Sequence, residues 1–209
     1  MITAREMLWG YANGIFPMAA AAEDPELHWF DPVERGILPV GGVHVSRSMR
    51  RHLRQSGWHA TLNSDFMAVV QGCARPGDTW INAPLTALYL ELHAIGHAHS
   101  LEIRDGDRIV GGIFGLSLGG AFFGESMFSA RRNGSKAALI WLSAHLAGCG
   151  FTLFDTQYPT EHLASMGGQT IPRADYLRRL SRAIRQDVDI RSRPLPEAQA
   201  LWQPSTQTS

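Results

Sequence analysis

The sequence predicts a mixed α/β (α+β) fold with a largely antiparallel sheet and a small N-terminal domain. The middle of the chain has the pattern of three consecutive strands, connected by tight turns at Asp105-Gly106 and Gly119-Gly120. A helix at 135–147 and a further apolar strand at 151–155 come next. An antiparallel meander followed by a helix and a strand is typical of a mixed sheet covered by helices.

Helix caps and glycines delimit the elements around this meander. Thr3 and Glu6 form a capping box that begins the first helix, and Gly14 ends it. An irregular segment with an acidic loop then extends to Pro32. Beyond it we expect helices at 46–57, 64–74, 84–95, 160–168 and 173–186, and strands at 58–63, 99–104, 108–118 and 121–128.

Length and composition predict one main domain. With 209 residues, 44% of them hydrophobic, the chain is long enough for one compact core. We expect a reduced N-terminal domain at 1–31, the sheet domain at 32–193 and a disordered tail at 194–209. No apolar run reaches the length of a membrane span, and no signal-peptide pattern is present. Cys73 and Cys149 show no metal-ligand spacing, so we expect both to be reduced in a cytoplasmic protein.

Two carboxylates stand where apolar strands end. The glycine-studded run at 110–129 carries Glu125 among aromatic residues, and the strand that begins at Phe151 leads into Asp155. An unpaired carboxylate in apolar surroundings costs several kcal/mol, so two such placements indicate a functional site. Two structural roles stay open beside this interpretation. Asp155 can be a turn former, and Glu125 can be the ion-pair partner of Arg131.

Strand alternation predicts which side chains share a face with these acids. One face of the strand at 121–128 carries Ala121, Phe123, Glu125 and Met127. In the following strand, Asp155 and Gln157 lie on one face. We therefore expect their side chains to point into the same space at the C-terminal end of the strand, where such sheets bind ligands.

Positive charge gathers in one predicted helix. The formal net charge is zero, yet residues 35–64 contain five arginines and no Asp or Glu. Four of these arginines follow helical spacing and share one face: Arg47, Arg50, Arg51 and Arg54. The planar guanidinium suits phosphate, so this face is a candidate nucleic-acid contact, with a solvated helix face as the alternative.

Four aromatic residues lie in or beside irregular segments: Tyr11, Trp29, Trp80 and Tyr89. An exposed ring in such a place can stack on a nucleobase. A core position is the alternative for each of them, because large aromatic side chains are mostly buried.

Two further motifs suggest a cofactor or a metal, and both depart from the required pattern. The loop Arg131–Lys136 lies between a strand and a helix, where acetyl-CoA-dependent transferases hold pyrophosphate on backbone N–H groups. That motif needs a small residue where Lys136 stands. His93, His97 and His99 lack the spacing of metal ligands, so we expect hydrogen-bonded or surface histidines and no metal site.

Eight segments, in order along the chain, together resemble the leucyl/phenylalanyl-tRNA–protein transferases. They are GIFPM (14–18), DTWIN (78–82), ELHAIGHAHSLE (91–102), VGG (110–112), FFGESMFS (122–129), SKAAL (135–139), FDTQ (154–157) and IPRADYL (171–177). The resemblance extends from about Tyr11 to Tyr176. It implies a GNAT-like acyltransferase domain that uses no acetyl-CoA and no other cofactor.

The resemblance also implies an activity. Enzymes of this family transfer Leu or Phe, and less well Met, from aminoacyl-tRNA to proteins that begin with Arg or Lys. The product is a degradation signal of the bacterial N-end rule pathway. We expect a monomer without membrane contact. The alternatives are an acetyl-CoA-dependent GNAT N-acetyltransferase and a non-catalytic RNA-binding module.

The resemblance assigns the polar residues of the site. Asp155 and Gln157 match the pair linked to the attacking amine, and Glu125 matches the acid of the acceptor site. Arg51 and Arg54 match basic positions on the side of the tRNA acceptor stem.

The resemblance also assigns the apolar and aromatic residues. Trp80 matches an aromatic residue beside the terminal adenosine of the tRNA, and Tyr11 and Tyr89 match tyrosines near the same end. The pocket for the aminoacyl side chain corresponds to Ile113, Phe122, Leu139, Leu142 and Phe154. Two departures stand out: Met18 occupies a position where some members have Trp, and a longer N-terminal extension of some members is absent.

Overall fold

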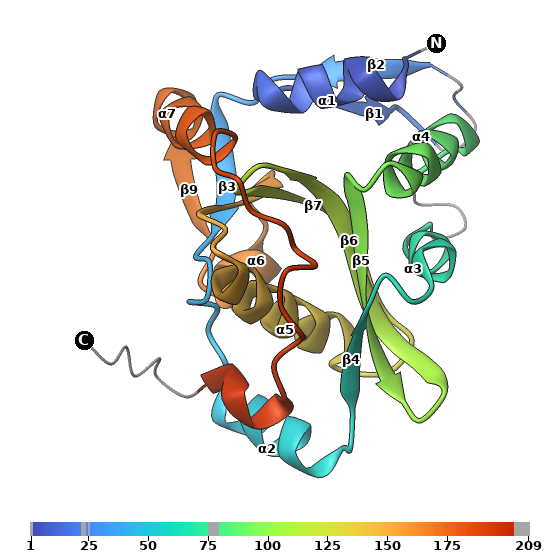
Figure 1. Cartoon of the computed structure of the whole chain (residues 1–209), viewed down its shortest axis with the longest axis vertical. Helices are drawn as coiled ribbons and strands as arrows, with labels where there is room; N and C mark the ends of the chain where they lie inside the picture. Colours follow the sequence, from blue (N-terminus) through green and yellow to red (C-terminus); the bar gives the residue numbers. More distant parts are fainter. Residues whose placement is uncertain (1, 22–23, 25, 75–79, 203–209) are drawn as a thin grey trace.

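The computed structural model describes residues 2–21, 24, 26–74 and 80–202 (Figure 1). Its body is a sheet with the strand order β4-β5-β6-β7-β8-β3-β9. In chain order these strands are β3 (Glu34–Leu38), β4 (His59–Leu62), β5 (Ala98–Asp105), β6 (Arg108–Leu118), β7 (Ala121–Ser129), β8 (Leu153–Gln157) and β9 (Gln169–Pro172). Among these described strands only β7 and β8 pair in parallel. The predicted mixed and largely antiparallel sheet is confirmed.

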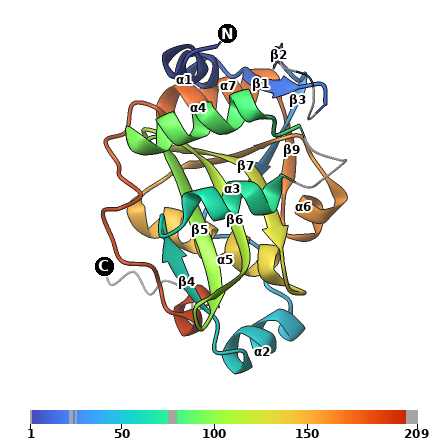
Figure 2. The same ribbon diagram turned by 90° about the vertical axis from the view of Figure 1, so that its right-hand side faces the viewer.

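Helices cover both faces of this sheet. They are α2 (Arg47–Gln55), α3 (Phe66–Cys73), α4 (Ala83–Ala94), α5 (Gly134–Cys149), α6 (Glu161–Ser165) and α7 (Arg173–Ala183). Figure 2 shows α3 and α4 in front of the sheet and α5 behind it. The two faces carry separate apolar cores, one built around Phe114 and Phe123 and the other around Phe122 and Trp141. Alternate residues of one strand thus enter opposite cores, as the pleat of a strand requires.

The N-terminal residues form a unit of their own against one end of the sheet. It consists of α1 (Ala4–Ala12) and a two-stranded ribbon of β1 (Phe16–Ala19) and β2 (Leu27–Phe30). The predicted capping box is confirmed, because Thr3 N donates to Glu6 and Glu6 N donates to the Thr3 hydroxyl. The segment expected to be irregular therefore contains two paired strands.

The sequence pattern did not predict two strands of the main sheet. β3 lies between β8 and β9, and it pairs antiparallel with both of them. Neither β3 nor β9 has five or more residues with clear alternation, so pairing with neighbours rather than local pattern creates them.

The end of the chain differs from the prediction of a disordered tail. Ala198–Trp202 form a 3₁₀-helix, and Trp141 Nε1 of α5 donates to the carbonyl oxygen of Pro196 at 2.9 Å. The prediction is wrong for this part, and residues 203–209 lie outside the described residues. The last predicted helix ends at Ala183, three residues early. None of the helices in the described part of the chain combines the length and apolarity needed to cross a membrane.

Candidate active site

A pocket of about 310 Å³ opens where β7 and β8 separate. The two strands pair only over Ala121–Phe123 and Leu153–Asp155. Beyond that point β7 continues along β6, while β8 continues along β3. The diverging strand ends leave a gap, and side chains from β1, β6, β7, β8, α5 and α6 line it.

A β-bulge places Glu125 at this gap. Gly115 and Phe114 of β6 pair with Gly124 and Ser126 of β7, so Glu125 between them is the extra residue. A bulge bends its strand and redirects side chains, and bulges are common beside active sites. Here it lets the consecutive residues 124–127 all line the pocket.

The bulge also reverses the side-chain alternation that the sequence predicted. Ala121 and Phe123 lie in the core beneath α3 and α4, and Glu125 contacts tyrosines of the same core. Met127 instead packs against the core beneath α5. The prediction of one shared face holds up to Glu125 and is wrong for Met127. Strand pairing determines where a bulge forms, and the alternation of residue types in the sequence does not reveal it.

β8 ends on a residue in the left-handed region. Phe154 and Thr156 line the pocket, and Asp155 between them is fully buried on the opposite face. Gln157 has a φ of 55°, which breaks the alternation and brings its side chain to the pocket. The prediction that Asp155 and Gln157 point into the same space is therefore wrong, and only Gln157 reaches it.

Two buried tyrosines hold the carboxylate of Glu125. Tyr11 Oη donates to Oε1 at 2.7 Å and Tyr89 Oη donates to Oε2 at 2.7 Å. Burial raises the pKa of Glu125 to about 7, and it outweighs these two hydrogen bonds, which lower the pKa. Burial and the neighbouring Glu125 charge raise the pKa of both tyrosines well above the usual value, so they remain donors. Glu125 forms no ion pair with Arg131, which instead pairs with Asp105.

Neither tyrosine lines the pocket, and both are 0% exposed. Ring stacking of Tyr11 or Tyr89 on a nucleobase is therefore excluded in this conformation. Both were assigned to substrate binding, and the structure lets them act on a ligand only through Glu125.

The amide of Gln157 has two hydrogen-bonding orientations. In one, Nε2 faces Glu125 Oε1 at the long distance of 3.5 Å. In the other, the amide nitrogen donates to Gly124 O at 2.9 Å and Thr156 O at 3.1 Å, which turns the amide oxygen toward Glu125. The first orientation also puts the amide oxygen against these two carbonyl oxygens, which cannot donate, so the second is favoured. The amide oxygen that it turns toward Glu125 suits a protonated carboxyl group, since an amide oxygen can only accept.

Asp155 has a full set of partners behind the pocket. Arg35 of β3 forms a fork with it, with Nε 2.9 Å from Oδ1 and Nη2 2.7 Å from Oδ2. Tyr176 Oη and the backbone N–H of Gln157 also donate to this carboxylate, at 2.8 and 2.9 Å. The bond to Gln157 offsets part of the cost of its left-handed backbone. Asp155 thus positions Gln157 and lies apart from the pocket.

Arg35 is a buried partner of Asp155 that the sequence did not single out. It is 1% exposed, its Nη1 donates to Gly14 O at 2.9 Å, and its guanidinium lies over the rings of Phe16 and Tyr176. Burial alone lowers the pKa of Arg35, and the hydrogen bonds and charge of Asp155 outweigh it and raise the pKa. The only signal in the sequence is an arginine just before the apolar residues 37–38.

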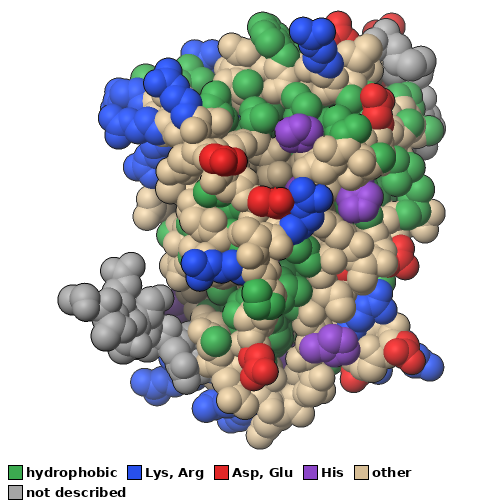
Figure 3. Space-filling view, in the orientation of Figure 1, with side chains coloured by type: hydrophobic (Ala, Val, Ile, Leu, Met, Phe, Trp, Pro, Cys, Tyr) green, Lys and Arg blue, Asp and Glu red, His purple; other side chains and the backbone are tan. Residues whose placement is uncertain are grey.

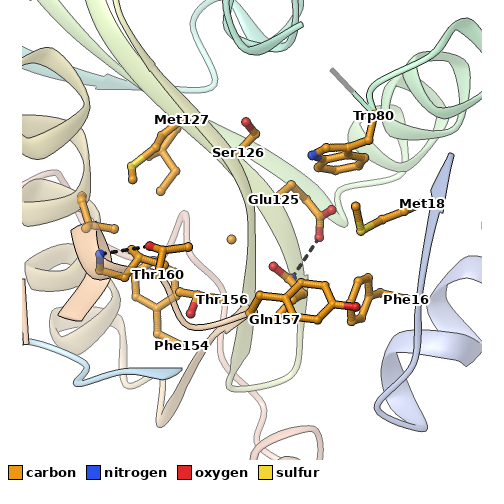
Figure 4. Close-up of a pocket in the computed structure, with 15 residues that line it drawn as sticks. Phe16, Met18, Trp80, Glu125, Ser126, Met127, Phe154, Thr156, Gln157 and Thr160 are labelled. Carbon is orange, nitrogen blue, oxygen red and sulfur yellow. Dashed lines mark hydrogen bonds between the residues drawn. The ribbon is translucent and has the colours of Figure 1, made fainter. Parts of the chain in front are cut away.

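The pocket has an apolar end and an aromatic mouth. In Figure 4, Met127 and Phe154 lie on one side, Trp80 and Met18 on the other, and Glu125 with Gln157 between them. Of the five residues predicted for the apolar end, three line it: Ile113, Leu139 and Phe154. Side chains that were not predicted complete the wall: Phe16, Ser126, Thr156, Tyr158, Thr160 and Leu163.

Phe122 and Leu142 do not reach the pocket. Both are 1% exposed in the core beneath α5, where the Phe122 ring stands edge-on to that of Phe154 at 5.5 Å between centroids. Phe122 supports the lining residue Phe154 from within this core, and Leu142 belongs to the same core.

The arginine helix α2 lies at the end of the molecule opposite to α1 and β1 (Figures 1 and 2). Met49 and Leu53 anchor its buried face. The four predicted arginines, Arg47, Arg50, Arg51 and Arg54, are exposed. In the space-filling view, further cationic side chains gather over α7 (Figure 3), where Arg178, Arg179 and Arg182 are exposed.

The motifs that suggested a metal or pyrophosphate have other contacts. His93, His97 and His99 each form a hydrogen bond, to Ala98 O, Ser117 O and Asn63 Nδ2 respectively. At the start of α5, the backbone N–H of Ser135 donates to Ser129 Oγ at 2.8 Å, so a side chain already occupies this donor.

Comparison with known proteins agrees with the site. The family described as "Leucyl/phenylalanyl-tRNA protein transferase" matches residues 37–181, and "Leucyl/phenylalanyl-tRNA protein transferase N-terminal domain" matches residues 1–33. The chain belongs to this family. A leucyl/phenylalanyl-tRNA–protein transferase of Paracoccus denitrificans is 64% identical over 208 residues, covering 100% of this chain and 98% of that protein.

Other members of the leucyl/phenylalanyl-tRNA protein transferase family show similar values. Proteins of that name from Cereibacter sphaeroides and Ruegeria sp. are each 52% identical, covering 100% of this chain and 98% and 99% of those proteins. The structure of L-PGS from Bacillus licheniformis aligns with a TM-score of 0.44 at 14% identity, covering 77% of this chain and 55% of that one. Family membership confirms the resemblance seen in the sequence and favours aminoacyl transfer over the acetyl-CoA-dependent alternative.

We expect the loss of one partner of the Arg35–Asp155 ion pair to destabilise the folded protein strongly. Arg35→Met leaves a buried unpaired carboxylate, so the free energy of unfolding should fall by about 3–5 kcal/mol. The double variant R35M/D155N should lose less than the sum of the single variants, because it leaves no uncompensated charge. Urea unfolding of the four proteins measures this coupling, and additive losses would contradict it.

Glu125 should make stability depend on pH. Its pKa of about 7 in the folded protein lies above the reference value of 4.5, so the folded state binds more protons between these values. The stabilising contribution is present below about pH 4.5 and is lost as the pH rises through about 7. The difference between the two pKa values corresponds to about 3 kcal/mol.

Glu125→Gln should remove this dependence, as measured by urea unfolding at several pH values. His99 has the opposite effect, since burial lowers its pKa to about 4, so the wild-type and variant curves are to be subtracted. Glu91→Gln, on the exposed side of α4, is the matched control and should follow the wild type. Parallel curves for wild type and Glu125→Gln would show that Glu125 keeps an ordinary pKa.

Proposed function

We propose that this chain transfers leucine or phenylalanine, and less well methionine, from aminoacyl-tRNA to the α-amine of proteins that begin with arginine or lysine. The pocket is the observation that supports this most. It has an apolar end, and at its polar centre the amide end of Gln157 lies 3.5 Å from Glu125 Oε1. Family membership supplies the reaction class. Marking of the acceptor for N-end rule degradation would follow from the new N-terminal residue.

The chemistry requires little beyond proximity and a neutral amine. The neutral α-amine attacks the ester carbon, a C–N bond forms and the ester C–O bond breaks, and the leaving ribose oxygen of the tRNA takes up the proton that the amine gives up. The ester is already activated, so holding the amine against the ester carbon supplies much of the rate enhancement. An α-ammonium has a pKa near 7.7–8.0, and Glu125 has a pKa of about 7. Proton transfer between groups with such similar pKa values is efficient near neutral pH. We assign the proton acceptor to Glu125, since it is the carboxylate that lines the pocket.

Gln157 and Asp155 have supporting roles in this proposal. In the favoured orientation the amide oxygen of Gln157 faces Glu125, where it can accept a hydrogen bond from the attacking amine and orient it. Asp155 fixes the backbone of Gln157 through Oδ1. It acts as a positioning residue, because Arg35 and Tyr176 occupy its remaining acceptor sites.

The aminoacyl side chain fits the apolar end. Ile113, Met127, Leu139 and Phe154 form its wall, and a methionine side chain can adapt to different shapes. Selection among Leu, Phe and Met should be graded, since one methylene changes binding by only about 1–3 kcal/mol. β-Branched Ile and Val would place their second substituent against the wall.

The mouth of the pocket suits the terminal adenosine of the tRNA. Trp80 and Met18 stand at this side, and an aromatic ring with a thioether forms a platform for a base. We propose a monomer that works in the cytoplasm, where aminoacyl-tRNA is made.

A transfer assay with Leu-tRNA and an Arg-initiated peptide tests this proposal. Wild type should form the Leu-peptide bond without added acetyl-CoA. Glu125→Gln should lower kcat by about 10²-fold or more, because it removes the proton acceptor. The affinity for tRNA should stay unchanged. A loss below about threefold, or equal use of Ile-tRNA and Leu-tRNA, would contradict the assigned site.

The exposed arginines of α2 should hold the acceptor stem through its phosphates. Four phosphate contacts give a slope of log K against log[salt] of about −3 to −4. Arg51→Ala combined with Arg54→Ala should flatten this slope by up to about two. The control R108A/R193A removes two exposed arginines elsewhere and should keep the slope. Equal slopes for both double variants would place the tRNA on another surface.

A further inference from the structure

A second hollow, of about 680 Å³, lies between α1, β2 and α4. Figure 2 shows these three elements together at one end of the molecule. Its wall includes Glu6 and Trp9 of α1, Glu26 and Trp29 at β2, and Pro84 and Leu88 of α4. The aromatic rings face solvent, because Trp9 is 62% and Trp29 39% exposed. We refer to this hollow as the N-terminal groove.

Aromatic rings beside carboxylates favour a cationic side chain. A ring face attracts Arg or Lys through its quadrupole, and a carboxylate adds a charge-assisted hydrogen bond. Glu6 and Glu26 line the groove, and neither Lys nor Arg is among its lining residues. The same two charges repel phosphate, so the groove does not suit the backbone of the tRNA.

Close packing and hydrogen bonds hold described parts of the groove. A Cβ on Gly10 would come within 2.2 Å of the Trp29 ring, so only glycine in α1 allows the ring to lie there. Asn82, which caps α4, donates to Asp24 O at 2.6 Å and ties Asp24 to that helix. Glu6 is held by its hydrogen bonds to Thr3.

The groove adjoins the pocket. Met18 lines the pocket and pairs across the ribbon with His28, which lines the groove. Directly paired residues of antiparallel strands lie about 4.5–5.5 Å apart. Trp80 of the pocket and Pro84 of the groove are four residues apart, so their Cα atoms are at most about 14 Å apart. Four to six residues of extended chain, at about 3.3 Å each, bridge such distances.

We propose that the N-terminal groove binds the acceptor polypeptide downstream of its first residue and favours lysine or arginine there. This inference rests on the proposed function, which places the α-amine of the acceptor at Glu125. The acceptor chain then leaves the pocket beside Met18, crosses the β1–β2 ribbon and lays a basic side chain between Trp9 and Glu26. The groove adds affinity for the protein substrate and leaves the chemistry unchanged.

Steady-state transfer to three acceptors tests the groove. The first is the dipeptide amide Arg-Ala, which ends before the groove. The other two are Arg-initiated decapeptides that carry either two lysines or two glutamines at positions five and seven. Wild type should show a KM for the lysine peptide three- to tenfold below that for the glutamine peptide. The double variant W9A/E26Q should abolish this difference and keep the KM for Arg-Ala.

Two controls make the result specific. Asp107→Asn removes an exposed carboxylate at the β5–β6 turn and should behave as wild type. The lysine peptide with an acetylated N-terminus cannot react, and its binding should shift the indole N–H signals of Trp9 and Trp29 in NMR spectra. Equal KM values for the two decapeptides in wild type would overturn the inference, as would weaker tRNA binding by W9A/E26Q.

The two proposals fail in different ways. If none of the three Arg-initiated acceptors is a substrate of the wild type, the proposed function is wrong, whatever the groove binds. If Arg-Ala is a substrate and the acetylated lysine peptide leaves the indole signals in place, only the groove assignment is wrong. The thermal transition of W9A/E26Q verifies that the variant folds. It should stay close to that of the wild type, because both side chains are exposed and contribute little to the core.

Discussion

The ion pair between Arg35 and Asp155 joins residues 120 positions apart, and four parts of the molecule meet at it. Arg35 comes from β3 and Asp155 from β8, while Gly14 of the N-terminal unit and Tyr176 of α7 bind the same two side chains. Two buried charges are tolerable only when nearly every donor and acceptor has a partner. This requirement fixes the relative positions of all four parts at once, and with them the end of β8 that carries Gln157.

The pocket follows from this constraint together with the bulge in β7. A parallel pair that stops after three residues opens the sheet, and the two strand ends then present their backbones and side chains to the gap. Gly124 allows the close approach, since a Cβ there would come within 3.0 Å of the Phe154 ring. The result is one half-enclosed space in which an apolar end and a single carboxylate face each other.

Burial raises the pKa of Glu125 into the range that the proposed reaction requires. An acid that faced water would be ionised and too weak a base for an α-ammonium, whereas a fully enclosed one would stay protonated. Two tyrosine hydroxyls stabilise the ionised form and keep the pKa near 7 despite the apolar surroundings. The N-terminal unit contributes one of these tyrosines and Met18 at the mouth, so it takes part in the site as well as covering it.

The sequence alone was enough to predict the meander, α5 and the mixed sheet, because alternation, turn residues and helix caps are local signals. It also singled out Glu125, Gln157 and Trp80, since polar or aromatic residues at strand and loop ends stand out against apolar runs. Tertiary structure alone decided the direction of each side chain. The bulge at Glu125, the left-handed Gln157 and the partner of Asp155 all depend on pairing between distant segments, which a one-dimensional pattern does not record. β3 exists as a strand only because β8 and β9 lie beside it, and for the same physical reason Arg35 became visible as the partner of Asp155 only in the folded chain.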